Sequence, residues 1–167
     1  MKKLLSVFIA VMLALALTAC GGAIPQNTSC EEILAAAQSS HTPPDCEKLY
    51  EKSQGNLDAF SLSLWADGLY EECGDIELLD DYAIYIGAGS ISYEIAVLKA
   101  KSKSDTAKLE QLIERRKATL SLGDRAMYDP DFQTKMDNSI MYSDGQLVIF
   151  LLTDDNDAAL KKINELK

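Results

Sequence analysis

The spacing of hydrophobic residues changes along this chain. Residues 4–17 (LLSVFIAVMLALAL) form one unbroken apolar run of 14 residues, whereas later segments alternate or repeat every three to four positions. A helix that spans a bilayer needs about 20 apolar residues, so the first run is short for a permanent span. Its positive start and the small residues that follow are typical of a secretory signal. The later pattern predicts a folded domain.

Two short helices are predicted before the first strand. Ser29 and Glu32 have the spacing of a capping box, so a helix should start there and continue through EILAAAQ. The prolines at 43–44 end it, because proline cannot continue a helix. Asp45 can cap a second helix over CEKLYEKSQ. Residues 28–56 are therefore interpreted as an N-terminal helical segment.

The second half of the chain shows the order strand, strand, helix twice. The predicted strands are 82–86, 93–100, 140–142 and 147–152, and the predicted helices cover about 105–122 and 158–167, with a short turn near 130–137. An Asp-Gly pair between the last two strands favours a tight hairpin. Residues 57–167 are thus predicted to form an α+β domain. It should contain a four-stranded, mainly antiparallel sheet from two ββα units, with helices on one face.

One predicted strand is apolar on both faces. LVIFLL (147–152) has no polar position, so this strand should be central and covered on both sides. Helices on one face leave the other face open. Three coverings satisfy the pattern: the N-terminal helices, a second copy of the chain, or another partner.

The residues after the apolar run predict a lipid anchor. Leu17-Thr18-Ala19-Cys20 resembles the lipobox of bacterial lipoproteins. The resemblance implies signal cleavage between Ala19 and Cys20 and an S-diacylglyceryl group on Cys20, whose amine is either acylated or free. Residues 1–19 would then be a lipoprotein signal peptide, and residues 20–27 the lipidated cysteine and a short tether. The alternative is an ordinary signal cut near Ala19, with Cys20 as a spare thiol.

The composition limits the kinds of molecule that this protein is expected to bind. Without the signal, 148 residues remain, enough for one domain, and 47% of the full chain is hydrophobic, enough for a core. Loss of Lys2 and Lys3 leaves 14 basic residues against 26 acidic ones, a formal charge of −12. Such a surface repels nucleic acid and lacks a polybasic attraction to anionic headgroups. We therefore expect attachment to the outer face of a bacterial membrane by lipid alone.

The remaining cysteines leave the pairing open. Outside the cytoplasm, one disulfide can form among Cys30, Cys46 and Cys73, and we slightly prefer Cys30 with Cys46. These three with His41 lack the clustered spacing of a zinc site. Calcium-loop registers that start at the acidic segments also fail to supply the required carboxylates. No metal site and no cofactor is predicted.

The sequence contains no recognisable catalytic group. His41 is the one histidine and follows two serines in a proline-bounded loop, a poor position for a general base. Ser90 lacks the G-x-S-x-G context of a nucleophile elbow. Several tyrosines fall in or near predicted strands, where core packing is a more common role than sugar binding; they are Tyr82, Tyr85, Tyr93, Tyr128 and Tyr142.

A family resemblance covers about residues 57–167. DDYAIYIGAGSISYEIAVLKAKS, the helix with LIERRK, and QLVIFLLTDD with its helix resemble the Gram-positive bacterial lipoprotein family catalogued as domain of unknown function 4358. The resemblance implies a lipid-anchored surface protein with no assigned activity and supplies no functional residues. It also implies one alternative role, as an accessory to an O-acyltransferase system of the envelope.

These observations lead to one functional expectation with an alternative. We expect a non-enzymatic accessory or interaction domain, anchored by lipid at the cell surface and bound to an envelope protein or to a second copy of itself. The alternative is a lipoprotein that binds a small ligand or a glycan. The sequence identifies neither the ligand nor the partner.

Overall fold

The computed structural model describes residues 23–70, 74–89, 92–123 and 125–167. Its helices are α2 (Cys30–Gln38), α3 (Ala59–Asp67), α4 (Thr106–Leu122), α5 (Phe132–Asp137) and α6 (Asn156–Asn164). Its strands are β1 (Cys46–Glu51), β2 (Leu79–Gly87), β3 (Glu94–Ala100), β4 (Ile140–Asp144) and β5 (Leu147–Leu152). The 3-10 turns are η1 (Lys52–Gln54), η2 (Gly74–Leu78), η3 (Lys103–Asp105) and η4 (Arg125–Met127). None of the described helices is long and apolar enough to cross a membrane.

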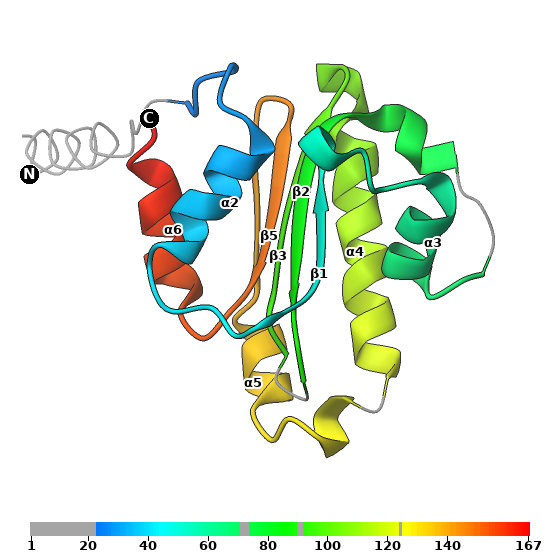
Figure 1. Cartoon of the computed structure of the whole chain (residues 1–167), viewed down its shortest axis with the longest axis vertical. Coiled ribbons are helices and arrows are strands. Elements are labelled where there is room, and N and C mark those ends of the chain that lie inside the picture. The colour runs from blue at the N-terminus through cyan, green and yellow to red at the C-terminus, as the bar shows by residue number, and fades with distance from the viewer. Residues whose placement is uncertain (1–22, 71–73, 90–91, 124) are drawn as a thin grey trace, which may run out of the picture.

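The strands form one open antiparallel sheet in the order β1-β2-β3-β5-β4 (Figure 1). Val97 in the centre pairs with Ala83 of β2 on one side and Ile149 of β5 on the other. The α+β class and the two hairpins are confirmed. The prediction of four strands is wrong, because the described sheet contains a fifth strand, β1.

β1 replaces the second of the two predicted N-terminal helices. The first helix is present as α2, and its Ser29–Glu32 capping box is formed as expected. The segment that begins at Cys46 instead pairs with the free edge of β2, with Tyr50 opposite Ile84. Sheet pairing outside the segment therefore overrides its local helical signal. Residues 28–56 belong to the same sheet and core as the rest of the domain.

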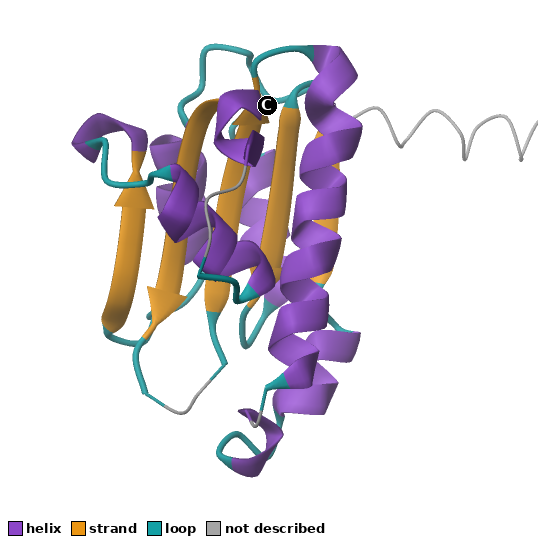
Figure 2. Ribbon diagram, turned by 90° about the vertical axis from the view of Figure 1, so that its right-hand side faces the viewer, coloured by secondary structure: helices purple, strands orange, loops and turns teal. Residues whose placement is uncertain are grey.

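Helices cover both faces of the sheet, so the prediction of helices on one face is wrong (Figure 2). α3 and α4 pack on the face that includes Leu98 and Phe150, and α2 and α6 pack on the face that includes Val97 and Ile149. The cause is the alternation of side chains along a strand, which gives both faces of β3 and β5 apolar residues. The chain's own helices thus provide the covering that LVIFLL requires.

The two predicted ββα units place their helices differently. α4 follows the β2–β3 hairpin and lies on one face, whereas α6 follows the β4–β5 hairpin and lies on the other. Their similar sequence patterns therefore do not produce equivalent packing. This arrangement leaves room beside α6 for α2, which contacts both α6 and the sheet.

The chain enters the described fold beside the β4–β5 hairpin. The backbone N–H of Ile24 donates to Asp144 Oδ2 at 2.8 Å, and Ile24 is buried in the core under α2 and α6. The Gly145–Gln146 turn connects the two strands, with a positive φ at Gly145. We call this the hairpin end of the domain. The opposite end, with residues 88–89, 92–93 and 153–155, is the far end (Figure 1).

A buried ion pair joins α4 and α3 to the sheet. Arg116 Nε lies 3.0 Å from Glu94 Oε1, and Arg116 Nη2 lies 2.5 Å from Glu94 Oε2. Trp65 donates through Nε1 to the same carboxylate at 2.8 Å, and its carbonyl accepts from Arg116 Nη1. Arg116 is therefore buried, although it lies within the charged segment LIERRK. The pair is stable only because each charge is hydrogen-bonded.

Replacing one partner of this pair should be costly. Arg116→Met leaves Glu94 charged and unpaired in the core, so we expect the free energy of unfolding to fall by about 3–5 kcal/mol. Urea unfolding monitored by circular dichroism measures the loss. The matched control is Arg115→Met, which removes a partly exposed bridge to Asp67 and Asp75 and should cost about 1 kcal/mol or less. Equal losses for the two variants would contradict the assigned role of the buried pair.

Candidate functional site

The far end of the domain gathers the longer connections and a group of polar side chains. β5 ends in a turn that Asn156 fixes, because its Oδ1 accepts from the backbone N–H of Thr153 at 2.8 Å. The Nδ2 of Asn156 donates to the carbonyl of Asn138 at 2.8 Å, which holds the turn against the end of α5. Asp155 caps α6 by accepting from Ala158 N. These contacts position the residues on either side of a cleft.

Lys135 of α5 lies at the centre of this group. Its Nζ is 2.9 Å from Asp154 Oδ1, 3.7 Å from Asp129 Oδ2 and 3.5 Å from the carbonyl oxygen of Ser92. The side chain of Lys135 is only 13% exposed. The lysine therefore connects α5 to the β5–α6 turn and to the residues just before β3.

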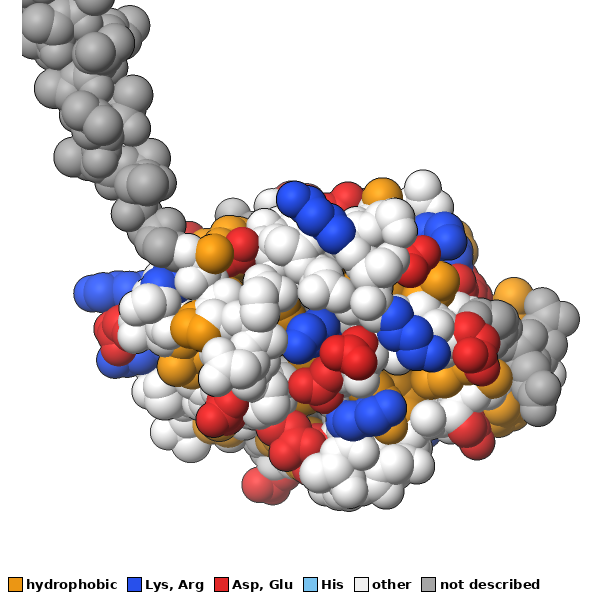
Figure 3. Space-filling model, turned by 90° about the horizontal axis from the view of Figure 1, so that it is seen from above, with side chains coloured by type: hydrophobic (Ala, Val, Ile, Leu, Met, Phe, Trp, Pro, Cys, Tyr) orange, Lys and Arg blue, Asp and Glu red, His pale blue; other side chains and the backbone are white. Residues whose placement is uncertain are grey.

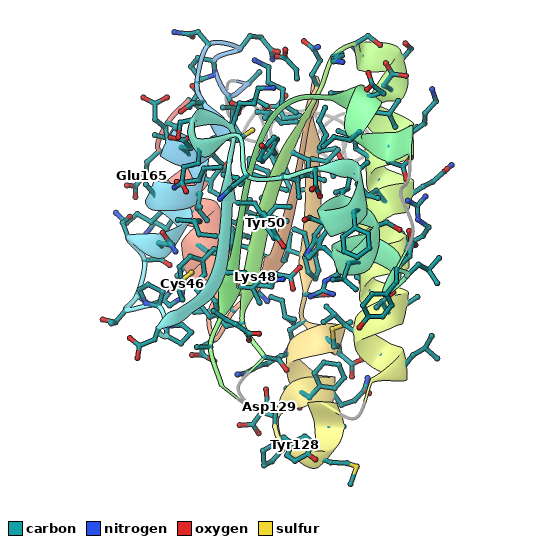
Figure 4. All side chains as sticks on the ribbon, turned by 45° about the vertical axis from the view of Figure 1, so that its right-hand side comes forward. Cys46, Lys48, Tyr50, Tyr128, Asp129 and Glu165 are labelled. Atoms are coloured by element: carbon teal, nitrogen blue, oxygen red, sulfur yellow. The ribbon has the colours of Figure 1, made fainter. Side chains whose placement is uncertain are left out.

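Asp129 is the buried acid of the group, and it lies at the far end below the sheet (Figure 4). Its carboxylate accepts from Ser92 N at 2.7 Å and from Asp131 N at 3.1 Å. Burial alone would raise the pKa of Asp129. The two backbone hydrogen bonds and the positive charge of Lys135 outweigh burial and hold this pKa below its ordinary value.

The hydroxyl of Ser92 is buried and has no hydrogen-bond partner among the described residues. Buried polar atoms are nearly always paired, so an unpaired one calls for an explanation. Ser92 is held in place by its backbone, whose N–H binds Asp129 and whose carbonyl faces Lys135. The hydroxyl lies close enough to Asp129 to help lower the pKa of that carboxyl, without forming a hydrogen bond of normal geometry.

A cleft of about 380 Å³ opens beside Lys135. Its lining combines hydroxyl, amide, carboxylate and ammonium groups; the residues are Thr134, Lys135, Asn138, Ile140, Thr153, Asp154, Asp155, Asn156 and Asp157. Such a surface offers hydrogen bonds to a small polar molecule. Among the residues that the structure describes, no group of three or more His, Cys, Asp or Glu side chains is arranged to hold a metal ion.

The structure does not join Cys30 to Cys46. Cys30 is buried in α2, Cys46 is exposed at the start of β1, and both are free thiols (Figure 4). Burial, together with the nearby Asp81 carboxylate, raises the pKa of Cys30 far above its ordinary value, so this thiol is unreactive. The predicted lipidation and cleavage sites at Cys20 and Ala19, and the third candidate cysteine, Cys73, lie outside the described residues.

His41 has a structural position beside the core. Its Nε2 lies 2.9 Å from the hydroxyl of Tyr93, and its Nδ1 lies 2.6 Å from Ser40 Oγ. Ser40 Oγ already donates to the carbonyl of Ala37, so Nδ1 must donate to Ser40 and Nε2 must accept from Tyr93 in neutral histidine. Both ring nitrogens thus have hydrogen-bond partners, and the proton on Nδ1 points toward Ser40.

The predicted aromatic positions divide between core and surface. Tyr82, Tyr85 and Tyr93 are buried, which confirms core packing for these three. Tyr142 is half-buried on edge strand β4, and Tyr128 is 63% exposed after η4. They come from different parts of the fold, so the described tyrosines do not form the sugar-binding face considered from the sequence.

Sequence reasoning did not find the polar group around Lys135. Its members are far apart in the chain, and none of them belongs to a recognisable motif. One signal was available for the buried ion pair described above: Glu94 falls within an otherwise apolar strand, where a charge requires a partner. No comparable signal exists for Ser92 or Lys135.

Both partners of the buried ion pair, together with Ser92, Asp129 and Lys135 of the far-end group, lie between the start of β2 and the end of β5 in the sequence. Residues 75–153 match the family described as domain of unknown function, DUF4358. The match supports the resemblance to domain of unknown function 4358 over these residues. The matched residues include all four strands of the two hairpins, as well as Glu94, Arg116, Asp129 and Lys135. Searches of curated proteins and of solved structures found no match.

The pKa of Asp129 predicts how stability depends on pH. Because the folded pKa lies below the unfolded value of about 3.9, the carboxylate stabilises the fold above that pH and loses this effect as pH falls through the folded pKa. Asp129→Asn should therefore lower the free energy of unfolding by about 1–3 kcal/mol at pH 7 and by less at pH 3. Urea unfolding at pH 7, 5 and 3 measures the difference.

The neighbouring acid provides the control for this series. Asp131 is exposed, so Asp131→Asn should leave stability nearly unchanged at every pH. A difference between wild type and Asp129→Asn that stayed constant from pH 7 to pH 3 would show that the carboxylate charge is not the stabilising feature.

Proposed function

We propose that this protein is a lipid-anchored, non-enzymatic interaction domain at the outer face of a bacterial membrane. The proposal joins the lipobox-like sequence Leu17-Thr18-Ala19-Cys20 to a domain whose far end carries the exposed loops, the cleft and the polar group. The DUF4358 match names no activity and is compatible with this role.

The observation that carries the proposal is that the folded core begins only four residues after Cys20 in the sequence. Ile24, only four residues later, is buried and hydrogen-bonded to Asp144. A chain extends by at most about 3.6 Å per residue, so a lipid on Cys20 would be held within about 14 Å of Ile24. Cleavage before Cys20 would remove the apolar residues 4–17 and leave the acyl chains close to the folded domain.

A non-enzymatic role is supported by the state of the polar groups. Ser40 donates its proton to the carbonyl of Ala37 and not to His41, so His41 does not act as a base toward this hydroxyl, and Cys30 is buried. The absence of catalysis remains a prediction. Acyl transfer or hydrolysis by the purified domain on envelope substrates would contradict it.

The anchoring proposal is tested by replacing single cysteines with alanine. In cells that produce the full chain and are supplied with a labelled fatty acid, Cys20→Ala should abolish labelling and release the protein from the membrane fraction. Two or more acyl chains hold a protein stably at a bilayer, and without them nothing in this acidic chain is expected to replace that hold. Labelling and fractionation are measured on the same samples.

Cys46→Ala provides the matched control, because Cys46 is also exposed but lies at the far-end start of β1. This variant should keep both the label and the membrane location. A Cys20→Ala protein that stayed labelled and membrane-bound would exclude the proposed anchor.

A second candidate function is the binding of a small polar ligand in the far-end cleft. The favouring observation is the cleft of about 380 Å³ beside Lys135, with carboxylates, amides and hydroxyls in its lining. Thermal-shift screening with envelope sugars, peptides and ions tests this function. A ligand at 100 times its Kd stabilises a protein by about 2.7 kcal/mol, which for a domain of this size raises Tm by about 5–10 °C.

Two variants of exposed aspartates test whether such a rise in Tm comes from binding in the cleft. Asp157→Ala removes a lining carboxylate and should abolish the shift, whereas Asp137→Ala, on α5 outside the lining, should preserve it. A screen in which no compound raises Tm would count against ligand binding and favour the interaction role.

A further inference from the structure

Exposed apolar side chains gather around the ends of α3 and α4. Seven large apolar side chains are exposed in the described residues, and six of them belong to α3, α4 or the segments just after these helices. Leu122 is 88% exposed and Tyr70 is 82% exposed. Isolated exposed apolar residues are ordinary in proteins, whereas a group in one place marks an interaction site.

Contacts between the two helices bring several of these side chains together. Thr119 Oγ1 donates to the carbonyl of Ala66 at 2.8 Å, so the last turns of α3 and α4 touch. Leu122 lies three residues after Thr119 and therefore on the same side of α4. The rings of Phe60 and Tyr70 are 6.3 Å apart. We call Phe60, Leu69, Tyr70 and Leu122 the α3–α4 patch.

The rim of the α3–α4 patch carries excess negative charge. Arg115 of α4 bridges two carboxylates, Asp67 at the end of α3 and Asp75 of η2, so one acid in this group is not neutralised. The mature chain as a whole has a formal charge of −12. A second copy would therefore be repelled at this surface, whereas a partner with Lys and Arg around an apolar centre would be attracted.

The position of the patch excludes the bilayer as its occupant if the protein is anchored through Cys20. α4 starts at the hairpin end, where Thr106 Oγ1 donates to the carbonyl of Gly145, and its 17 residues extend about 25 Å to Leu122. Ile24 belongs to the core cluster on the sheet face opposite to the one that α4 covers. A tether of at most about 14 Å holds the opposite corner of the domain to the membrane.

The hairpin end itself does not offer a basic membrane-binding surface. Seen from above, Lys and Arg side chains alternate with Asp and Glu (Figure 3). Several of these lysines are paired with acids, as Lys99 is with Asp80 and Lys101 is with Glu77. The lipid would hold this end down without a specific headgroup contact, and the α3–α4 patch would face away from the bilayer.

We propose that the α3–α4 patch is the docking surface for a protein partner in the envelope, which inserts an apolar segment flanked by basic side chains. This inference deepens the proposed function and rests on it for the location of the partner. Aromatic residues such as Tyr70 and Phe60 provide large, rigid contact areas, which commonly dominate protein–protein affinity. The acidic rim around Arg115 would select the charge of the partner.

The experiment is site-specific photo-crosslinking in intact cells that produce the full chain. A benzophenone amino acid replaces Tyr70 or Leu122 in turn, and Lys161 on the exposed side of α6 is the control position. The expected result is one crosslinked protein shared by positions 70 and 122 and at least tenfold weaker at 161. Mass spectrometry should place the crosslink in a segment of apolar and basic residues. Leu122→Ala should reduce the crosslink from position 70 about tenfold.

Every other result overturns the docking proposal. Crosslinks to a second copy would identify a dimer interface, crosslinks to lipid would place the patch on the bilayer, and equal or absent products at the three positions would show that the patch binds nothing. Fractionation of the same cells separates this failure from failure of the anchor. A wild-type protein in the membrane fraction with no patch-specific product rejects the docking surface alone, and a protein found away from the membrane rejects the proposed function as well.

Discussion

The fold depends on one constraint, which is that strands β3 and β5 are apolar on both faces. Along β3, Leu98 faces α4 while its neighbour Val97 faces α2 and α6. Neither face can be left in water, so helices must cover both. One face is covered by helices that follow their strands closely in sequence. The other needs α2, which comes from the N-terminal part of the chain. The need to cover this second face therefore makes the N-terminal segment part of the core.

Sequence patterns predicted the elements better than their arrangement. Hairpins, capping boxes and the long helix depend on neighbouring residues, so they could be located from local signals. β1 could not, because the six residues from Cys46 to Glu51 become a strand only through the free edge of β2. The face taken by α6 was also beyond prediction, since periodicity shows that a helix has an apolar side and not which layer it joins.

For the candidate site, too, local features could be predicted from the sequence, whereas contacts between distant segments could not. Asp154 lies just before the last helix, and this helix was predicted from a local pattern. Its contact with Lys135, and the contact of Lys135 with Asp129 and Ser92, depend on three connections that meet at the far end of the sheet. Polar groups assembled in this way leave no motif in the chain. Glu94 is the exception, because a charged residue within an apolar strand indicates that a buried partner must lie beside it.

The covering of the second sheet face by α2 also determines where the N-terminal segment lies. Because α2 must cover the sheet, the chain is drawn into the core from Ile24 onward, and little length remains between that residue and Cys20. A long tether would allow the domain to turn any surface toward the membrane. A tether of four residues fixes one corner instead, and leaves the far end and the α3–α4 patch on the side open to other molecules. The packing of the core would thus also determine how the anchored domain is presented.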